Sequence, residues 1–204
     1  MRTVRSTTFL SLDGVMQAPG GPDEDRTGGF DLGGWTVPFF DEQVGKVMGQ
    51  FMATPFDLLL GRRTYDIFAA FWPKASEEEG AGPLNAATKY VASRGKPQLE
   101  WPTSVLLEGD VPEAVRRLKQ SDGPELQVHG SGTLLQTLLG HGLVDELQLL
   151  VFPVVLGSGQ RLFSDGAMPR SLRLLESSTS GTGVVISRYA VEGEVRTGSF
   201  GSDA

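Results

Sequence analysis

The sequence predicts one α/β domain built on a largely parallel β-sheet. Short apolar runs bounded by turn residues recur along the chain, as in strands that are buried on both faces. Segments with apolar residues at helical spacing separate these runs, which favours strand–helix–strand units. The chain has 204 residues, of which 39% are hydrophobic. This length and composition suit one domain with a sizeable core.

The N-terminal third of the chain combines a strand, a long loop and a helix. Residues 3–10 alternate and carry β-branched side chains, which predicts a strand that ends in the turn residues 11–14. Residues 17–34 are rich in glycine and polar residues, and long loops of this kind are lids, binding loops or disordered segments. Residues 38–53 have apolar side chains at helical spacing, and Pro38 suits a first helical turn.

The rest of the chain continues the alternation of strands and helices. The C-terminal strands add an antiparallel edge, as is common in mixed sheets. We expect a domain over residues 1–192 and a flexible tail over 193–204. The expected elements are strand 56–60, a helix from about 62 to 70, a polar connection over 73–86, strands 89–93 and 104–107, helix 111–120, strand 126–129, helix 133–139, strand 145–155 with a break at Pro153, and strand 184–191.

Composition and charge exclude several functional classes. The formal net charge is −7, which disfavours binding to nucleic acid. The chain has no cysteine, so it has no disulfide, thiolate nucleophile or cysteine-based metal site. Its only histidines are His129 and His141, so we expect no metal site. Because the first residues lack a signal-peptide core and no stretch could span a bilayer, we expect a cytoplasmic protein with no membrane partner.

A glycine-rich turn joins the strand at 126–129 to the helix at 133–139. The turn reads Gly130-Ser131-Gly132. Free N–H groups at the start of the helix would form an anion site suited to a pyrophosphate. Leu135 stands where a dinucleotide-binding fingerprint has its third glycine, so a turn that serves only the fold is an equal alternative.

Two further strand ends carry arginines. Gly61-Arg62-Arg63-Thr64 follows a buried strand and starts a helix, where the helix dipole disfavours cations, so the arginines indicate an anionic partner. The alternative is that they are solvated surface charges. Ser93-Arg94 follows another strand. Ligands of open α/β sheets bind at the carboxyl ends of strands, and arginines there favour the 2′-phosphate of NADPH.

The order of these motifs resembles that of the dihydrofolate-reductase-like superfamily. More narrowly, the chain resembles the C-terminal reductase domain of bifunctional riboflavin-biosynthesis deaminase-reductase proteins and its stand-alone bacterial relatives. The resemblance covers about residues 2–191. It implies a three-layer fold with a mixed, mostly parallel central sheet flanked by helices, NADPH as the hydride donor, and a homodimer. The segments that carry it beside the three motifs above are Ser11-Leu12-Asp13-Gly14, 143–147, Pro153, 156–159 and 162–163.

The resemblance also implies which residues line the cofactor. The loop at 17–34 would be the lid, and the other positions fall into four groups. These are Gly61, Arg62, Arg63 and Thr64 at the adenosine side and pyrophosphate, Ser93 and Arg94 near the 2′-phosphate, Gly130, Ser131, Gly132, Thr133 and Leu134 at the pyrophosphate and nicotinamide, and Ser11, Asp13 and Gly14 near the nicotinamide and lid.

The substrate side has weaker candidates. Folate-reducing relatives place a substrate-binding acid on the helix after the lid, and Asp41 follows Trp35 and Pro38 in a similar pattern with a spacing one residue longer. We name Asp41 and Asp13 as catalytic candidates, although Asp41 would serve equally well in the first helical turn. For Asp145 and Glu146, which precede a strand, solvation at the strand entrance is the preferred interpretation over contact with substrate. An aromatic set would form core or stack on a heterocycle, with core preferred, and it comprises Trp35, Phe39, Phe40, Phe68, Phe71 and Trp72.

The expected reaction is hydride transfer from NADPH to an electrophilic carbon of a small heterocycle, with the proton supplied by a carboxylate or by water. The resemblance points to 5-amino-6-(5-phosphoribosylamino)uracil reductase activity. Dihydrofolate reductase activity, a non-catalytic dinucleotide-binding protein and a purely structural role are the alternatives. The ligands of a zinc deaminase are absent, so the chain would act alone or on another substrate. Apolar strands near 147–156 and 184–191 favour a homodimer.

Overall fold

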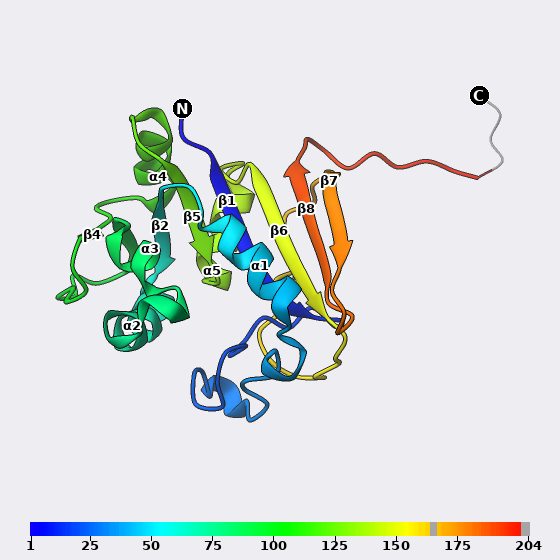
Figure 1. Cartoon of the computed structure of the whole chain (residues 1–204). Coiled ribbons are helices and arrows are strands. Elements are labelled where there is room, and N and C mark those ends of the chain that lie inside the picture. Colours follow the sequence, from blue (N-terminus) through cyan, green and yellow to red (C-terminus); the bar gives the residue numbers. More distant parts are fainter. Residues whose placement is uncertain (164–166, 201–204) are drawn as a thin grey trace.

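The computed structural model describes residues 1–163 and 167–200. Its centre is an eight-stranded sheet in the order β4-β3-β2-β5-β1-β6-β8-β7 (Figure 1). Strands β1 to β6 pair in parallel, and β8 pairs antiparallel with both β6 and β7. The predicted mixed, mostly parallel sheet is therefore confirmed. The strands are β1 Val4–Ser11, β2 Phe56–Gly61, β3 Lys89–Ala92, β4 Ser104–Leu106, β5 Glu125–His129, β6 Glu146–Phe152, β7 Leu172–Thr179 and β8 Val185–Val191.

Helices cover both faces of this sheet and make three layers. On one face, α4 and α5 pack their leucines and valines against the central strands. On the other face, α1 packs on the β1–β6–β8 side, while α2 and α3 pack on β2 and β3 (Figure 1). The helices are α1 Glu42–Phe51, α2 Arg62–Phe71, α3 Ala81–Ala86, α4 Val111–Gln120 and α5 Gly132–Gly140, with short 3₁₀ turns at Thr27–Gly29, Val37–Phe39, Trp72–Lys74 and Glu77–Glu79.

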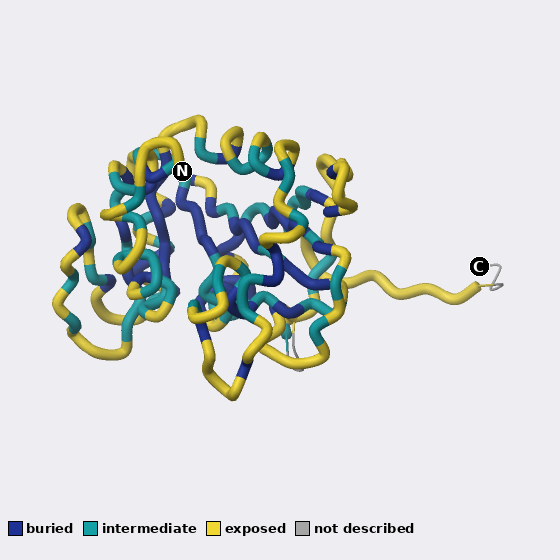
Figure 2. Tube along the Cα trace, turned by 60° about the horizontal axis from the view of Figure 1, so that its bottom comes forward, coloured by how far each residue is buried: buried dark blue, intermediate teal, exposed yellow. Residues whose placement is uncertain are grey.

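Local sequence explains why the central elements form. Residues 56–60 are buried without interruption, because helices cover β2 on both faces, and the strand is therefore apolar on both faces rather than alternating. The exception is Asp57, whose buried carboxylate pairs with Arg2. Helix α4 begins where the side chain of Asp110 accepts a hydrogen bond from the backbone N–H of Glu113, with Pro112 in the first turn. In Figure 2 the buried residues, in dark blue, lie mainly in the interior of the sheet.

The structure corrects three sequence expectations. The helix predicted from residue 38 begins at Glu42, because Asp41 caps it and a separate 3₁₀ turn precedes it. The connection over 73–86 contains α3, whose Gly, Pro and Asn residues gave no helical signal. Strand β7 was not predicted, because all eight of its residues are exposed and its leucines do not alternate along the whole strand.

The last strand of the sheet is followed by backbone contacts with the start of β7. Strand β8 ends at Val191, and the backbone of Gly193 and the backbone of Glu194 accept hydrogen bonds from Ser171. Of the tail expected over 193–204, residues 201–204 lie outside the described residues. Within the described chain, no helix is both long enough and apolar enough to cross a membrane.

Candidate functional site

Two strand–turn–helix junctions meet at the carboxyl ends of β2 and β5. The hydroxyl of Ser131 accepts a hydrogen bond of 2.8 Å from the backbone N–H of Gly61 and donates one of 2.7 Å to Oγ1 of Thr64. One side chain therefore ties the turn before α5 to the turn before α2. Two motifs that lie about 70 residues apart in the sequence, Gly-Arg-Arg-Thr and Gly-Ser-Gly, form one structural unit.

The backbone of this unit is held in a conformation that glycine tolerates best. Gly130 and Ser131 both have a φ of +61°, in the left-handed region. A Cβ atom on Gly61 would lie 3.3 Å from the Ser131 hydroxyl, closer than ordinary contact allows. Left-handed backbone at a serine costs of order 1 kcal/mol, and such outliers cluster at functional sites.

The N-termini of α2 and α5 both open at this unit. Among the described residues, no side chain caps either helix, and neither first turn carries an acid. Their first N–H groups therefore lack intrahelical partners and carry partial positive charge. Two such helix ends on adjacent parallel strands, joined by Ser131, fit the pyrophosphate of a dinucleotide.

The arginines beside this unit are held by carboxylates. Arg62 pairs with Asp66 one turn along α2, at 2.7 Å, and this contact raises the pKa of the guanidinium. Arg63 pairs with Asp25 of the lid loop, also at 2.7 Å. From the sequence, we expected these arginines to face either an anionic ligand or solvent. In the structure, each pairs with a carboxylate of the same chain. Both side chains are partly exposed, so a phosphate could still reach them.

The carboxyl end of β3 lies beside that of β2, in the order β3-β2-β5. Gly61 and Ala92 are in register in the parallel pair β2–β3, so the residues that follow them leave the sheet side by side. Arg62 is the next residue on one strand and Ser93 on the other, with the exposed Arg94 after it. This register brings the predicted 2′-phosphate residues to the same edge of the sheet.

The lid loop, residues 17–34, folds back toward the strand ends. Asp25 is buried, and its carboxylate accepts hydrogen bonds from the Gln17 amide and from the backbone N–H and hydroxyl of Thr27. A cavity of about 290 Å³ is lined by residues 17 and 27–30 of the loop and by residues 158–160, and the Gln160 N–H donates a hydrogen bond of 3.0 Å to the Gln17 side chain beside it. Met16, just before the loop, lies against Gly132 at the start of α5, with its sulfur 3.1 Å from where a Cβ would be.

Asp13 joins the turn after β1 to the loop after β6. Its carboxylate accepts hydrogen bonds from the Ser11 hydroxyl at 2.7 Å and from the N–H groups of Leu156 and Gly157, and it pairs with Arg161. The Ser11 hydroxyl, followed by these N–H groups, holds the pKa of Asp13 well below its usual range. Gly14, with a φ of +82°, completes the turn. The carboxylate therefore stays ionised and fixes two loops.

Asp41 is the N-cap of α1. Its side chain accepts a hydrogen bond of 2.9 Å from the Val44 N–H and others from the N–H and hydroxyl of Thr182 in the β7–β8 turn. The Val44 N–H is the main reason that the pKa of Asp41 is lowered. The sequence allowed Asp41 either to bind substrate or to serve in the first helical turn, and in the structure it caps the start of α1.

His129, directly before Gly130, is buried and neutral. Its Nε2 lies 3.0 Å from the side-chain oxygen Oε1 of Gln127, and its ring packs among Phe51, Phe56 and Phe68. Burial lowers its pKa to about 4. The predicted aromatic set forms two separate clusters. Trp35 and Phe39 pack on Phe152, whereas Phe68 and Phe71 contact Trp72. Phe40 is half exposed.

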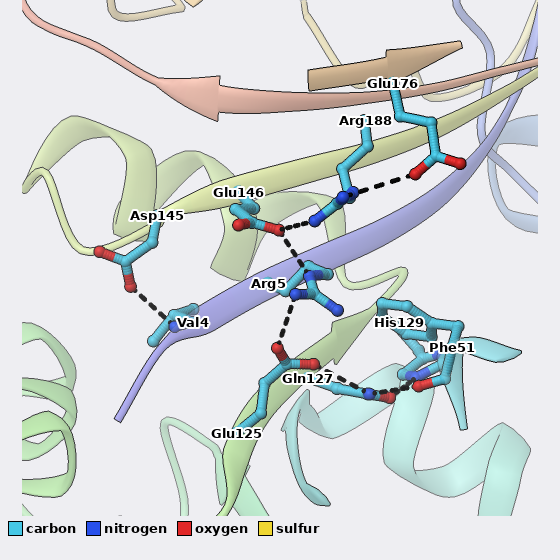
Figure 3. A network of polar contacts seen from close by, with 10 residues as sticks. All are labelled: Val4, Arg5, Phe51, Glu125, Gln127, His129, Asp145, Glu146, Glu176 and Arg188. Atoms are coloured by element: carbon cyan, nitrogen blue, oxygen red, sulfur yellow. Dashed lines mark hydrogen bonds and ion pairs between the residues drawn. The ribbon is translucent and has the colours of Figure 1, made fainter. Parts of the chain in front are cut away.

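Asp145 and Glu146 at the entrance to β6 are partly solvated, as predicted, and both also have partners within the chain. Asp145 accepts from the Val4 N–H and pairs with Lys119. Glu146 pairs with Arg5 at 2.8 Å and with Arg188 at 3.3 Å. Both acids stand at the start of β6, where the neighbouring elements β1, α4 and β8 supply the cations that pair with them. Figure 3 shows the ion pairs that link Glu125, Arg5, Glu146, Arg188 and Glu176, and separately the contact of Asp145 with Val4.

Sequence reasoning missed the residues of this network and the lid contact of Asp25. Gln127 and Gln148 were visible signals, because each is a polar residue within a strand predicted to be buried or strongly apolar, and Arg5 is a charged residue within the alternating strand predicted at 3–10. They line or adjoin a groove of about 200 Å³ between the end of α1 and strands β6, β7 and β8. A charged or amide side chain in a buried strand requires a partner, and that requirement could have been stated from the sequence.

The sequence is similar to a known protein family and to individual bacterial proteins. The family model described as the RibD C-terminal domain matches residues 2–186. Two uncharacterized proteins of Bacillus subtilis (strain 168) are similar in sequence. YyaP is 30% identical over 132 residues, which is 63% of this chain and 70% of YyaP. YwjB is 30% identical over 135 residues, which is 66% of this chain and 73% of YwjB.

Solved structures share the fold. A candidate riboflavin biosynthesis protein from Shewanella sp. PV-4 has a TM-score of 0.66 and 19% identity, with 93% of this chain and 99% of that chain covered. A pyrimidine reductase-like protein from Corynebacterium diphtheriae has a TM-score of 0.59 and 14% identity, with 96% and 93% covered. Dihydrofolate reductase from Enterococcus faecalis, solved with NADP(H), has a TM-score of 0.57 and 13% identity, with 93% and 96% covered. The predicted dihydrofolate-reductase-like fold is confirmed.

Proposed function

Because the chain belongs to the RibD C-terminal domain family, we propose that it is an NADPH-dependent reductase of a small heterocyclic substrate. The observation that carries the proposal is the pair of helix N-termini, uncapped by described side chains, that Ser131 joins at the carboxyl ends of β2 and β5. This arrangement supports a pyrophosphate site. The registered strand ends with Arg62, Ser93 and Arg94 support a preference for the 2′-phosphate.

The chain's residues would divide the work as follows. N–H groups at the starts of α2 and α5 bind the pyrophosphate, with Ser131 and Thr64 holding the two turns together. The turn after β1, with Ser11 and Gly14, supports the nicotinamide side. Asp13 acts as a positioning residue, because its carboxylate is fully used in joining that turn to the loop after β6.

NADPH, when bound, supplies the hydride, and the protein supplies position and exclusion of water. The lid loop at 17–34 screens the reacting carbon from solvent. Hydrogen bonds keep Asp13 and Asp41 ionised, which leaves neither as a ready proton donor near neutral pH. The proton that completes the reduction therefore comes from water. Asp41 serves the site by fixing the start of α1.

The test of this proposal is NADPH oxidation in the presence of a panel of pyrimidines, pteridines and dihydrofolate. Turnover that Ser131→Ala reduces through a higher KM for NADPH supports the proposal. NADPH binding without any turnover would instead favour a dinucleotide-binding protein. Turnover confined to dihydrofolate would favour a folate reductase, which the fold similarity alone does not select.

We also propose that the protein is a homodimer, with β7 as the contact. The expected strands at 147–156 lie inside the sheet, whereas β7 is its edge strand and exposes Leu172, Leu174 and Leu175. A long edge strand with exposed apolar residues is a pairing surface unless something covers it. Light scattering should give twice the chain mass of 21.9 kDa, and Leu174→Lys should give the monomer mass.

A further inference from the structure

The loop at 93–103 carries two of the residues proposed at the 2′-phosphate, Ser93 and Arg94, and has little structure of its own. It is the crossover between the parallel strands β3 and β4, at the edge of the sheet where α2 and α3 lie (Figure 1). Such crossovers are usually helical, but this one contains no helix. Within the described chain, residues 94–100 make no hydrogen bond to another element. The position of Arg94 therefore depends on how the two ends of the loop are held.

The far end of this loop is fixed by a buried lysine, Lys89, which is the first residue of β3. Its Nζ donates hydrogen bonds to the Asn85 carbonyl at 2.6 Å, to the Pro102 carbonyl at 3.1 Å and to the Thr103 hydroxyl at 3.0 Å. The same nitrogen lies over the ring of Trp101, 4.4 Å from its centroid. We call Lys89 and these four residues the Lys89 cage.

The charge of Lys89 is unusual for its surroundings. Among the described residues, the partners of its Nζ are neutral oxygens and an aromatic ring, and none is a carboxylate. Burial lowers the pKa of Lys89 to about 8, so the side chain is mainly an ammonium at pH 7, with three N–H donors that match the three oxygens. An apolar side chain would fill the same space without the cost of burying a charge. The lysine therefore indicates a requirement beyond packing.

A strained residue lies in the same cage. Thr103 has a φ of +60°, in the left-handed region that a β-branched residue rarely adopts. Its hydroxyl accepts a hydrogen bond from Lys89 and donates one of 2.8 Å to the Ala87 carbonyl, so two contacts hold the strained backbone in place. A buried charge and a strained backbone thus coincide where the loop rejoins the sheet. Such outliers persist where the position of a segment matters to function.

The Lys89 cage also joins the loop to the helix that begins at the candidate site. The backbone N–H of Trp101 donates a hydrogen bond of 3.0 Å to the hydroxyl of Tyr65, and its ring N–H donates one of 2.8 Å to Oδ1 of Asn85. Tyr65 lies in the first turn of α2, directly after Thr64, which Ser131 binds. The cage therefore fixes the loop relative to the helix start that is proposed to bind the pyrophosphate.

We propose that Lys89 is a positioning residue for the cofactor, which holds the loop at 93–103 so that Arg94 meets the 2′-phosphate of NADPH. The inference deepens the proposed function and rests on it. NADH has a hydroxyl in place of this phosphate, whereas the helix ends that bind the pyrophosphate serve both dinucleotides alike. Loss of the ammonium should therefore weaken NADPH selectively. A general loosening of the fold would weaken NADPH and NADH together.

The test measures the affinities of both dinucleotides by calorimetry. Lys89→Met keeps an apolar side chain of similar length and removes the ammonium. We expect NADPH to bind about tenfold more weakly than to the wild type, the loss of about one charge-assisted hydrogen bond, and NADH to stay within about twofold. Thr103→Gly should show the same selective loss, and it keeps the test open if Lys89→Met does not fold, because Thr103 is exposed and glycine accepts the left-handed backbone. Hydrogen exchange in residues 94–103 should rise in both variants.

Lys119→Met is the matched control, because Lys119 is also a buried lysine. It donates to the Leu143 carbonyl and pairs with Asp145 just before β6, at the opposite end of the strands from the candidate site. Lys119→Met should lower Tm and leave both dinucleotide affinities unchanged.

The positioning role is overturned if Lys89→Met binds NADPH as tightly as the wild type does, or if NADPH and NADH weaken by the same factor. An unchanged rate of hydrogen exchange in residues 94–103 would show that Lys89 does not hold the loop, and would overturn it as well. These outcomes leave the reductase standing, whereas wild-type protein that binds neither dinucleotide would refute the reductase and this role together.

Discussion

Acidification should destabilise this protein through His129. Its Nε2–H donates to the side-chain oxygen Oε1 of Gln127, because the side-chain nitrogen Nε2 of Gln127 already donates to the Phe51 carbonyl, and aromatic rings enclose the rest of the imidazole. Burial lowers its folded pKa to about 4, whereas a histidine in an unfolded chain titrates near 6.5. Between these values the unfolded state binds more protons, so stability falls as pH falls through that window.

The magnitude follows from the difference between the two pKa values. Roughly 2.5 pKa units at about 1.36 kcal/mol each give about 3 kcal/mol lost on going from pH 7 to pH 4. Urea unfolding at several pH values, for the wild type and for His129→Gln, isolates this contribution because the carboxylates are common to both. The reasoning is refuted if the difference in unfolding free energy between the two proteins stays constant between pH 7 and pH 4.

Three further perturbations test the loops and turns. Ser131→Ala removes both hydrogen bonds that join the two turns, so urea unfolding should show a loss of about 1–3 kcal/mol and calorimetry a weaker NADPH affinity. Asp13→Ala should cost a similar amount and raise hydrogen exchange in residues 154–161, and an unchanged exchange rate would contradict its positioning role. Asp25→Asn weakens the ion pair with Arg63, so the rate of protease cleavage within residues 17–34 should rise about fivefold over that of the wild type. A cleavage rate equal to that of the wild type would show that this ion pair does not hold the loop.

The fold was predictable to the extent that burial leaves a pattern in the sequence. Strand β2 and helix α4 were found because apolar runs and caps mark them. Strand β7 was not, because every one of its residues is exposed and its pairing with β8 is the only cause of its structure. Helix α3 likewise depends on packing of Leu84 into the core rather than on propensity.

The candidate site was predictable in its motifs and not in its contacts. Glycine turns at strand ends identified Gly61 and Gly130, because such turns need positive φ or close approach. No sequence rule could show that Ser131 joins the two turns or that Arg63 pairs with the lid, since both contacts join segments far apart in the chain. The side-chain partners of Asp13 and Asp41 were hidden for the same reason.

The most direct test of the reductase proposal is a calorimetric titration of the wild-type protein with NADPH and, in parallel, with NADH. The account predicts a Kd for NADPH of about 1–10 μM, near −8 to −7 kcal/mol, with NADH at least about tenfold weaker. Arg62→Ala and Arg94→Ala should each reduce the preference for NADPH over NADH, since both arginines follow the registered ends of β2 and β3, where an arginine can pair with the 2′-phosphate. Absence of binding by either dinucleotide at about 1 mM would contradict the account and leave the joined helix ends as a feature of the fold alone.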